Sequence, residues 1–136
     1  MSSIKQKFTY FFTIRSKIRM IKHKDSKAGD LKGNFMYIVD HYNDGIRKIG
    51  LTTNLYARFR TYKTHSGKFK MYYFTLSDDC SKEEGNSTVL RCRETEIKTA
   101  LKDYKLKYSK INEEKYSSDF YKTINVMYEI LKEYLK

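Results

Sequence analysis

A carboxylate interrupts the apolar side of a helix that the sequence predicts over residues 88–108. Large side chains recur there at helical spacing, which indicates one stripe facing a core; its members are Leu90, Ile97, Leu101, Tyr104 and Tyr108. The position missing from this series is Glu94. A buried carboxylate is costly unless it is paired, bound to a metal or at the edge of the core. Glu94 therefore either marks where the stripe reaches the surface or points into a site.

A second group of candidates lies in residues 36–50, MYIVDHYNDGIRKIG, where two β-rich runs flank an Asn-Asp-Gly turn and predict a hairpin. A two- or four-residue connection centred on the Asp-Gly pair would place His41 opposite Lys48 and put Tyr37 on the same face as both. A three- or five-residue connection would break this arrangement, and a tyrosine in a half-buried strand is also common.

The stretch after the hairpin, TTNLYARFRTYK (52–63), changes to a helical period. Arg58 lies beside the apolar stripe of this helix, whereas Arg60 points elsewhere. Taken alone, Arg58 is better explained as a charge on the flank of the helix.

These segments form a strand, strand, helix, strand, helix, helix series. It predicts an α/β (α+β) domain with a small, mainly antiparallel three-stranded sheet flanked by helices. We expect strands at 35–41, 46–52 and 69–77, and helices at 52–63, 88–108 and 117–136. Thr52 or Thr53 could cap the first helix, and Ser117 or Ser118 the last.

The chain is strongly basic, with a formal charge of +12 over 136 residues. Residues 1–33 hold nine Lys/Arg and two acids, residues 34–77 hold seven and two, and residues 78–136 hold twelve of each. This uneven charge favours a polyanionic partner, nucleic acid or an anionic membrane surface. For nucleic acid, with DNA favoured over RNA, the candidate contacts are Arg47, Arg60, Lys63, Lys68 and Lys70.

Cys80 and Cys92 make no disulfide framework and are expected as free thiols. The longest apolar stretch near the start, FTYFF, is too short to span a bilayer, and no secretory signal is visible. We expect an intracellular protein of the cytoplasm or nucleus with no membrane partner and no small-molecule cofactor. Residues 1–24 contain no acid, so a targeting peptide or a membrane-binding arm stays open, although no clean helical stripe is seen there.

Taken together, these positions resemble the GIY-YIG endonuclease superfamily. The first triplet of the family would fall on residues 35–37, and the second on residues 48–50 after ten intervening residues. The arginine of the family follows the second glycine by eight residues and lands on Arg58, and its helical glutamate lands on Glu94. Lys48 in place of tyrosine resembles the KIGxT branch of phages and large DNA viruses. Tyr62 stands where a histidine is frequent, and Asn112 is the candidate for a late polar Asn.

The resemblance implies a nuclease domain over residues 34–136, preceded by a basic arm and linker over residues 1–33. It implies Mg²⁺ or Mn²⁺ held by Glu94, a phosphate held by the planar guanidinium of Arg58, and Tyr37 as the group that relays or accepts the proton of the attacking water. With a usual pKa near 10, Tyr37 needs a nearby cation to act as a base at neutral pH, and Lys48 could supply it. Tyr62 would be a secondary hydrogen-bonding group. The alternative is a module of the same fold that binds nucleic acid without cutting it.

Overall fold

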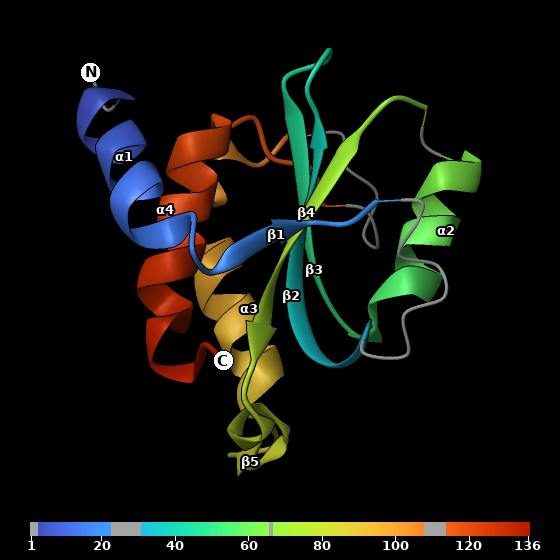
Figure 1. The fold of residues 1–136 in the computed structure, drawn as a ribbon, viewed down its shortest axis with the longest axis vertical. Helices are drawn as coiled ribbons and strands as arrows, with labels where there is room; N and C mark the ends of the chain where they lie inside the picture. Colours follow the sequence, from blue (N-terminus) through green and yellow to red (C-terminus); the bar gives the residue numbers. More distant parts are fainter. Residues whose placement is uncertain (1–2, 23–30, 66, 108–113) are drawn as a thin grey trace.

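The computed structural model describes residues 3–22, 31–65, 67–107 and 114–136 (Figure 1). Its helices and helical turns are α1 (Ser3–Thr9), the π-helical η1 (Tyr10–Ile14), α2 (Leu55–His65), η4 (Asp78–Ser81), α3 (Val89–Ala100), η5 (Lys102–Tyr104), α4 (Phe120–Leu131) and η6 (Lys132–Tyr134). Its strands are β1 (Ile18–Met20), β2 (Lys32–His41), β3 (Ile46–Asn54), β4 (Lys70–Leu76), β5 (Glu83–Glu84) and β6 (Ser87–Thr88). In this part of the chain, no helix has the length and apolarity that crossing a bilayer requires.

The main sheet is antiparallel and has the strand order β1-β4-β2-β3. The α+β class is therefore confirmed. The sheet has four strands rather than the expected three because β1, from the basic N-terminal segment, pairs with β4. β3 is the edge strand at the other side of the sheet.

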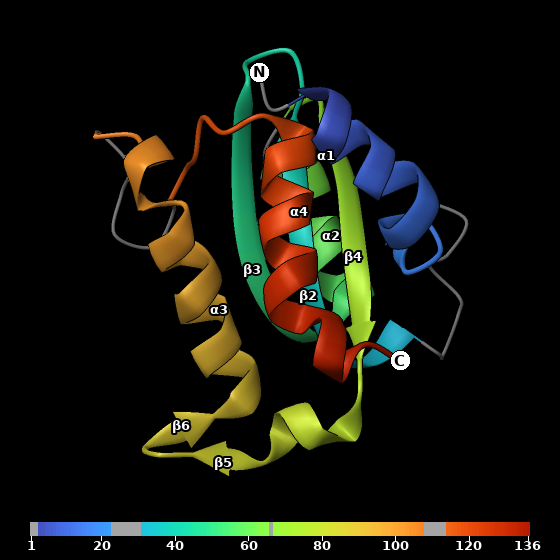
Figure 2. The ribbon, with the colours of Figure 1, turned by 90° about the vertical axis from the view of Figure 1, so that its left-hand side faces the viewer.

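The central strand β2 is buried on both faces, since helices cover the sheet on each side. Met36 and Ile38 belong to one core with α3 and α4, whereas Phe35, Tyr37 and Val39 belong to the other with α2. Alternate side chains of a strand point to opposite faces, so β2 supplies both cores. Figure 2 shows α3 beside β3, and α1 on the far side of α4 from α3.

The caps differ from those expected by one or two residues. The Ala57 amide donates to Asn54 Oδ1 (3.1 Å), so Asn54 caps α2 in place of Thr52 or Thr53. The Lys122 amide donates to Asp119 Oδ1 (2.9 Å), so Asp119 caps α4 in place of Ser117 or Ser118. Asn and Asp are both favoured at the N-cap of a helix, because their side-chain oxygens accept hydrogen bonds from backbone amides of the first turn.

α3 is shorter than the helix expected over 88–108. After η5 the chain turns away, because the Leu106 amide donates to the Lys115 carbonyl (2.9 Å) and Lys105 bridges to Tyr116. These tertiary hydrogen bonds compete with helix propagation and leave no signal in the apolar period. Tyr108 and Asn112 lie outside the described residues.

The hairpin register differs from the expected one by two residues, with His41 paired to Ile46, Val39 to Lys48 and Tyr37 to Gly50. The connection contains four residues but is displaced by one toward the N-terminus. A shift of two preserves the face of every side chain. The predicted placement of Tyr37, His41 and Lys48 on one side of the sheet is therefore confirmed, although the predicted pairs are wrong.

Candidate active site

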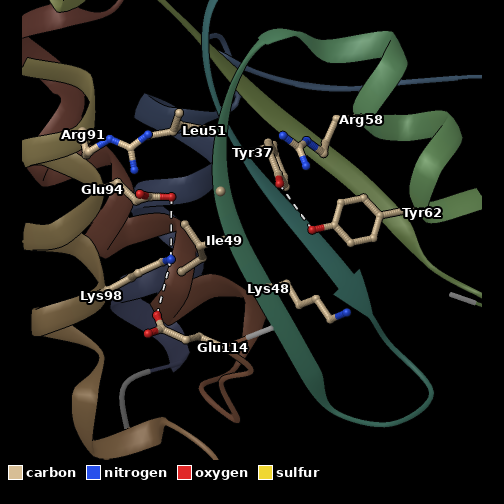
Figure 3. Close-up of a pocket in the computed structure, with 11 residues that line it drawn as sticks. Tyr37, Lys48, Ile49, Leu51, Arg58, Tyr62, Arg91, Glu94, Lys98 and Glu114 are labelled. Carbon is tan, nitrogen blue, oxygen red and sulfur yellow. Dashed lines mark hydrogen bonds and ion pairs between the residues drawn. The ribbon is translucent and has the colours of Figure 1, made fainter. Parts of the chain in front are cut away.

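A polar pocket of about 460 Å³ opens at the β3 edge of the sheet (Figure 3). Its lining comes from β2, β3, α2, α3 and the segment before α4: Tyr37, Lys48, Ile49, Gly50, Leu51, Arg58, Tyr62, Arg91, Glu94, Lys98 and Glu114. Tyr37, Arg58 and Glu94 are far apart in the sequence, and all three reach this pocket. In Figure 3 the tyrosines and Arg58 lie on one side of β3, and the carboxylates lie on the other.

Gly50 is the point where these two sides meet. It pairs with Tyr37 across the β2–β3 ladder, and a Cβ at Gly50 would overlap the Tyr37 hydroxyl and ring. The backbone of Gly50 is not in the left-handed region. Glycine is therefore required here for space, because only a residue without a side chain lets the Tyr37 phenol lie across the edge strand.

Tyr37 is held as a neutral phenol. Its hydroxyl shares a hydrogen bond with the Tyr62 hydroxyl (3.3 Å), and its ring is buried. Burial raises the Tyr37 pKa well above its usual value, Tyr62 and Glu94 raise it further, and only Arg58 opposes the shift. This direction opposes the expected role of Tyr37 as a base activated by Lys48, and that role stays a prediction. The Lys48 ammonium instead lies over the Tyr62 ring, 5.5 Å from its centroid.

Arg58 projects from the first half of α2 into the pocket and is exposed to solvent. Its neighbours Leu55 and Phe59 are buried against the sheet and fix the orientation of the helix. Arg60 points elsewhere, as expected, and its guanidinium lies over the Tyr56 ring at 5.4 Å. Of these two arginines, only Arg58 lines the pocket.

Glu94 lies where the α3 core gives way to the pocket. Leu90 and Ile97, one turn away on either side, are buried, whereas the Glu94 side chain keeps 14% of its surface exposed. The Lys98 ammonium lies 3.6 Å from Glu94 Oε2 and 3.3 Å from Glu114 Oε2. Glu94 therefore interrupts the apolar stripe at the wall of the pocket, and its role in a site stays a prediction.

Arg91, Lys98 and Glu114 were not among the residues that the sequence pointed to. Arg91 and Lys98 lie three residues before and four after Glu94, so they share its face of the helix. That spacing is a usable signal once Glu94 is suspected. No sequence signal pointed to Glu114, because tertiary folding brings it to the pocket. Burial alone would raise the pKa of Glu114, but Lys98 and Lys105 outweigh burial, so the pKa is lowered.

The donor set suits a hydrated divalent cation. Among the described residues, no three His, Cys, Asp or Glu side chains gather closely enough to enclose a metal ion. Glu94 nevertheless offers a carboxylate in an open polar pocket, and Mg²⁺ keeps several waters when one or two carboxylates bind it. The residues present therefore fit a metal held by one protein ligand, with Lys98 as its competitor for Glu94.

The five expected nucleic-acid contacts have two different environments. Arg47 has a structural role, because its guanidinium pairs with the nearly buried Asp40 (3.0 Å) and donates to the Ser118 carbonyl (3.0 Å). The other four are exposed on α2, just before β4 and at its first residue: Arg60, Lys63, Lys68 and Lys70. Those four are accessible to a polyanion, whereas Arg47 joins the hairpin to the segment that leads into α4.

Comparison with known protein families relates this chain to one of them. The profile of the T5orf172 domain matches residues 34–136. The chain belongs to the T5orf172 domain family. This phage-derived domain is related to GIY-YIG- and HNH-like nuclease folds, and it points to a nuclease-like or nucleic-acid-binding role. No curated protein and no solved structure matches the chain.

Proposed function

We propose that this T5orf172 domain is a divalent-metal-dependent endonuclease that hydrolyses phosphodiester bonds at the β3-edge pocket, with DNA as its first candidate substrate. One observation carries the proposal. Tyr37, Arg58 and Glu94, from β2, α2 and α3, line a single pocket. A phenol, a guanidinium and a carboxylate around one cavity match the needs of phosphate ester hydrolysis.

Arg58 and Arg91 would bind the scissile phosphate from opposite sides of β3. A guanidinium presents parallel N–H donors that match phosphate oxygens. Their charge would stabilise the extra negative charge that develops on the phosphate during attack. Lys48 adds a third cation at the pocket wall.

Tyr37 would act as a hydrogen-bond donor. Because burial keeps its pKa high, the phenol carries its proton throughout the neutral range. It would orient the attacking water or a phosphate oxygen, and Tyr62 would fix the direction of its hydroxyl. Removal of the proton from the attacking water then falls to another group or to solvent.

Glu94 is the residue that would hold Mg²⁺ or Mn²⁺. When bound, such an ion stabilises charge on the phosphate and on the leaving oxygen. Lys98 would have to move from Glu94 toward Glu114, to which it is already closer.

We also infer that the domain is of the GIY-YIG type, in the branch with a KIGxT second motif. Support comes from the ten residues between Tyr37 and Lys48 and the eight from Gly50 to Arg58. The exposed cations Arg60, Lys63, Lys68 and Lys70 would contact flanking phosphates and position the substrate.

One observation favours the alternative of a non-cutting binding module. Glu94 is paired with Lys98, and the Tyr37 hydroxyl is paired with Tyr62, so both groups already have partners. A module of this kind would hold nucleic acid through the basic surface and would show no metal-dependent turnover.

Nicking of supercoiled plasmid DNA in Mg²⁺ or Mn²⁺ tests the proposal. Glu94→Gln and Arg58→Ala should each reduce the nicking rate by about 100-fold or more, the range found when a group that stabilises transition-state charge is lost. The matched controls are Glu96→Gln, an exposed acid of the same helix, and Arg19→Ala, an exposed arginine of β1 outside the pocket. Both controls should cleave close to the wild-type rate.

Undiminished cleavage by Glu94→Gln would overturn the metal-binding role. If the wild-type protein cleaves neither DNA nor RNA with any divalent metal, but binds either one in a salt-sensitive manner, the binding module is the correct description.

A further inference from the structure

α1 and η1 expose an unusual amount of apolar surface for a short segment. Ile4, Phe8, Phe11 and Phe12 are 80%, 64%, 54% and 76% exposed. Of the six large apolar side chains that are exposed among the described residues, five lie in the first 20 residues. Contiguous exposed apolar surface on a folded protein commonly marks an interaction site.

The opposite face of the same segment is firmly docked. Tyr10 packs edge-on against Phe120 and Tyr121, with ring centroids 6.2 and 5.4 Å away, and Ile14 is fully buried. Asn125 in α4 donates to the Gln6 carbonyl (3.2 Å). The exposed side chains therefore belong to a segment that the core holds in place.

This arrangement explains why the sequence shows no single helical stripe. One apolar face, with Tyr10 and Ile14, packs on the core, and a second, with Phe8 and Phe12, faces solvent. The period also changes where the α-helical turns give way to the π-helical turns of η1. A segment that is apolar on two sides has no clean stripe, although each face is well defined in the structure.

The surroundings of the exposed face are basic. Residues 1–24 contain seven Lys/Arg and no acid. Lys5, Lys7 and Arg15 are exposed on this segment, and the Arg15 guanidinium lies over the Phe11 ring at 5.8 Å. Apolar side chains flanked by cations match a partner that has an apolar interior beneath a layer of anionic groups.

We propose that the α1–η1 face binds the interface of an anionic membrane, with Ile4, Phe8 and Phe12 inserted among the lipids and the flanking cations on the lipid phosphates. Charge decides against a second copy of this chain, since two surfaces without acids would repel each other. The ring arrangement decides against base stacking. Phe8 and Phe12 pack against one another with centroids 4.5 Å apart, so they do not present separate platforms for successive bases.

The position of the face leaves the β3-edge pocket available. α1 lies beyond α4, on the β1–β4 side of the sheet, whereas the pocket is at the β3 edge (Figure 2). Membrane binding here therefore does not depend on the proposed nuclease activity.

The chain contains no tryptophan, so Phe12→Trp introduces a single fluorescent reporter into the full-length protein. With vesicles of phosphatidylcholine and phosphatidylserine, its emission should shift to shorter wavelength, and lipids brominated along the chain should quench it. Vesicles of phosphatidylcholine alone should give a much smaller shift, and raising the salt concentration should weaken binding.

Co-sedimentation with the same vesicles provides the mutational test. Phe8→Ser with Phe12→Ser should reduce the bound fraction at limiting lipid by about tenfold or more, because both side chains would leave the acyl region. The control is Tyr42→Ser, which removes an exposed aromatic from the hairpin and should leave binding unchanged. Both variants should retain wild-type affinity for duplex DNA.

Equal binding by the wild type and the double variant would overturn the proposal. So would equal affinity for neutral and anionic vesicles. Loss of duplex binding in the double variant without loss of vesicle binding would assign the face to nucleic acid, and a dimer that the double variant dissociates would assign it to self-association.

Discussion

The two edges of the main sheet use positive charge in opposite ways. At the β3 edge, cations surround a polar pocket in which Glu94 and Glu114 also take part. At the β1 edge, cations flank exposed phenylalanines in a stretch without any acid. Both edges suit an anionic partner, but the first fits a phosphate that enters a cavity and the second fits a surface with an apolar interior.

The difference shows that the cations behind the formal charge of +12 do not all belong to one binding site. Arg47 pairs with Asp40, and Lys98 pairs with Glu94 and Glu114, so part of the charge stabilises the fold and the pocket. The surroundings of each cation decide its partner.

The largest expected effect is that of a substitution at Gly50, which should impair the β3-edge pocket and leave the α1–η1 face unchanged. Gly50→Ala would drive a Cβ into the Tyr37 phenol, which must then leave its position across β3. Nicking should fall by about 100-fold, a loss of the size seen when a transition-state donor is removed, while vesicle binding stays at the wild-type level. In a Tyr37→Ala background the same change should cost little further activity, since the clash is gone. Full nicking by Gly50→Ala would show that the Tyr37 position is unimportant.

The next effect concerns the docking of α1. Tyr10→Ala removes a ring that packs on Phe120 and Tyr121, and it should lower the free energy of unfolding by about 2 kcal/mol in urea titrations. Phe12→Ala, at an exposed position, should change it by less than about 0.5 kcal/mol. The nicking rate should be unaffected by either change. Equal destabilisation by both would mean that the exposed face belongs to the core.

Alkaline pH should lower the free energy of unfolding through the buried Tyr37 phenol. Burial raises the Tyr37 pKa, so above about pH 10 the unfolded chain loses this proton while the folded chain keeps it. Stability is therefore fully present below pH 10 and falls as pH rises further, by up to about 1.4 kcal/mol per pH unit for one group. Tyr37→Phe should make this fall shallower in urea titrations at pH 10 to 11, and Tyr42→Phe is the matched control. Identical slopes for wild type and Tyr37→Phe would contradict the buried, protonated phenol.

The smallest effect is expected on the open surface between the edges. Lys63→Gln and Lys68→Gln, both at exposed positions, should each weaken duplex binding a few-fold and reduce the slope of log affinity against log salt by about 1. Lys132→Gln, which removes the partner of Glu129 at the end of α4, should change neither quantity. A cation that leaves the salt slope unchanged on removal makes no phosphate contact.

Local pattern and motif spacing in the sequence were enough to find the principal candidates. The β-rich runs around the Asn-Asp-Gly turn predicted the hairpin, and Glu94 stood out because it broke an apolar period. The wrong register still gave the correct face for Lys48, because strand side chains alternate with a period of two. Tyr37, Arg58 and Glu94 could be named as a group only through their resemblance to a family motif.

What the sequence by itself determined, then, is the α+β class, the order of the longer elements from β2 to α4 and the identity of five pocket residues. Tertiary structure decided the rest. It made β1 a fourth strand, gave Arg47 a structural role, raised the pKa of Tyr37 by burial and brought Glu114 to Lys98. Each of these depends on contacts between residues distant in the sequence. Local periodicity carries no information about such contacts, because burial and ion pairing are set by which surfaces pack together.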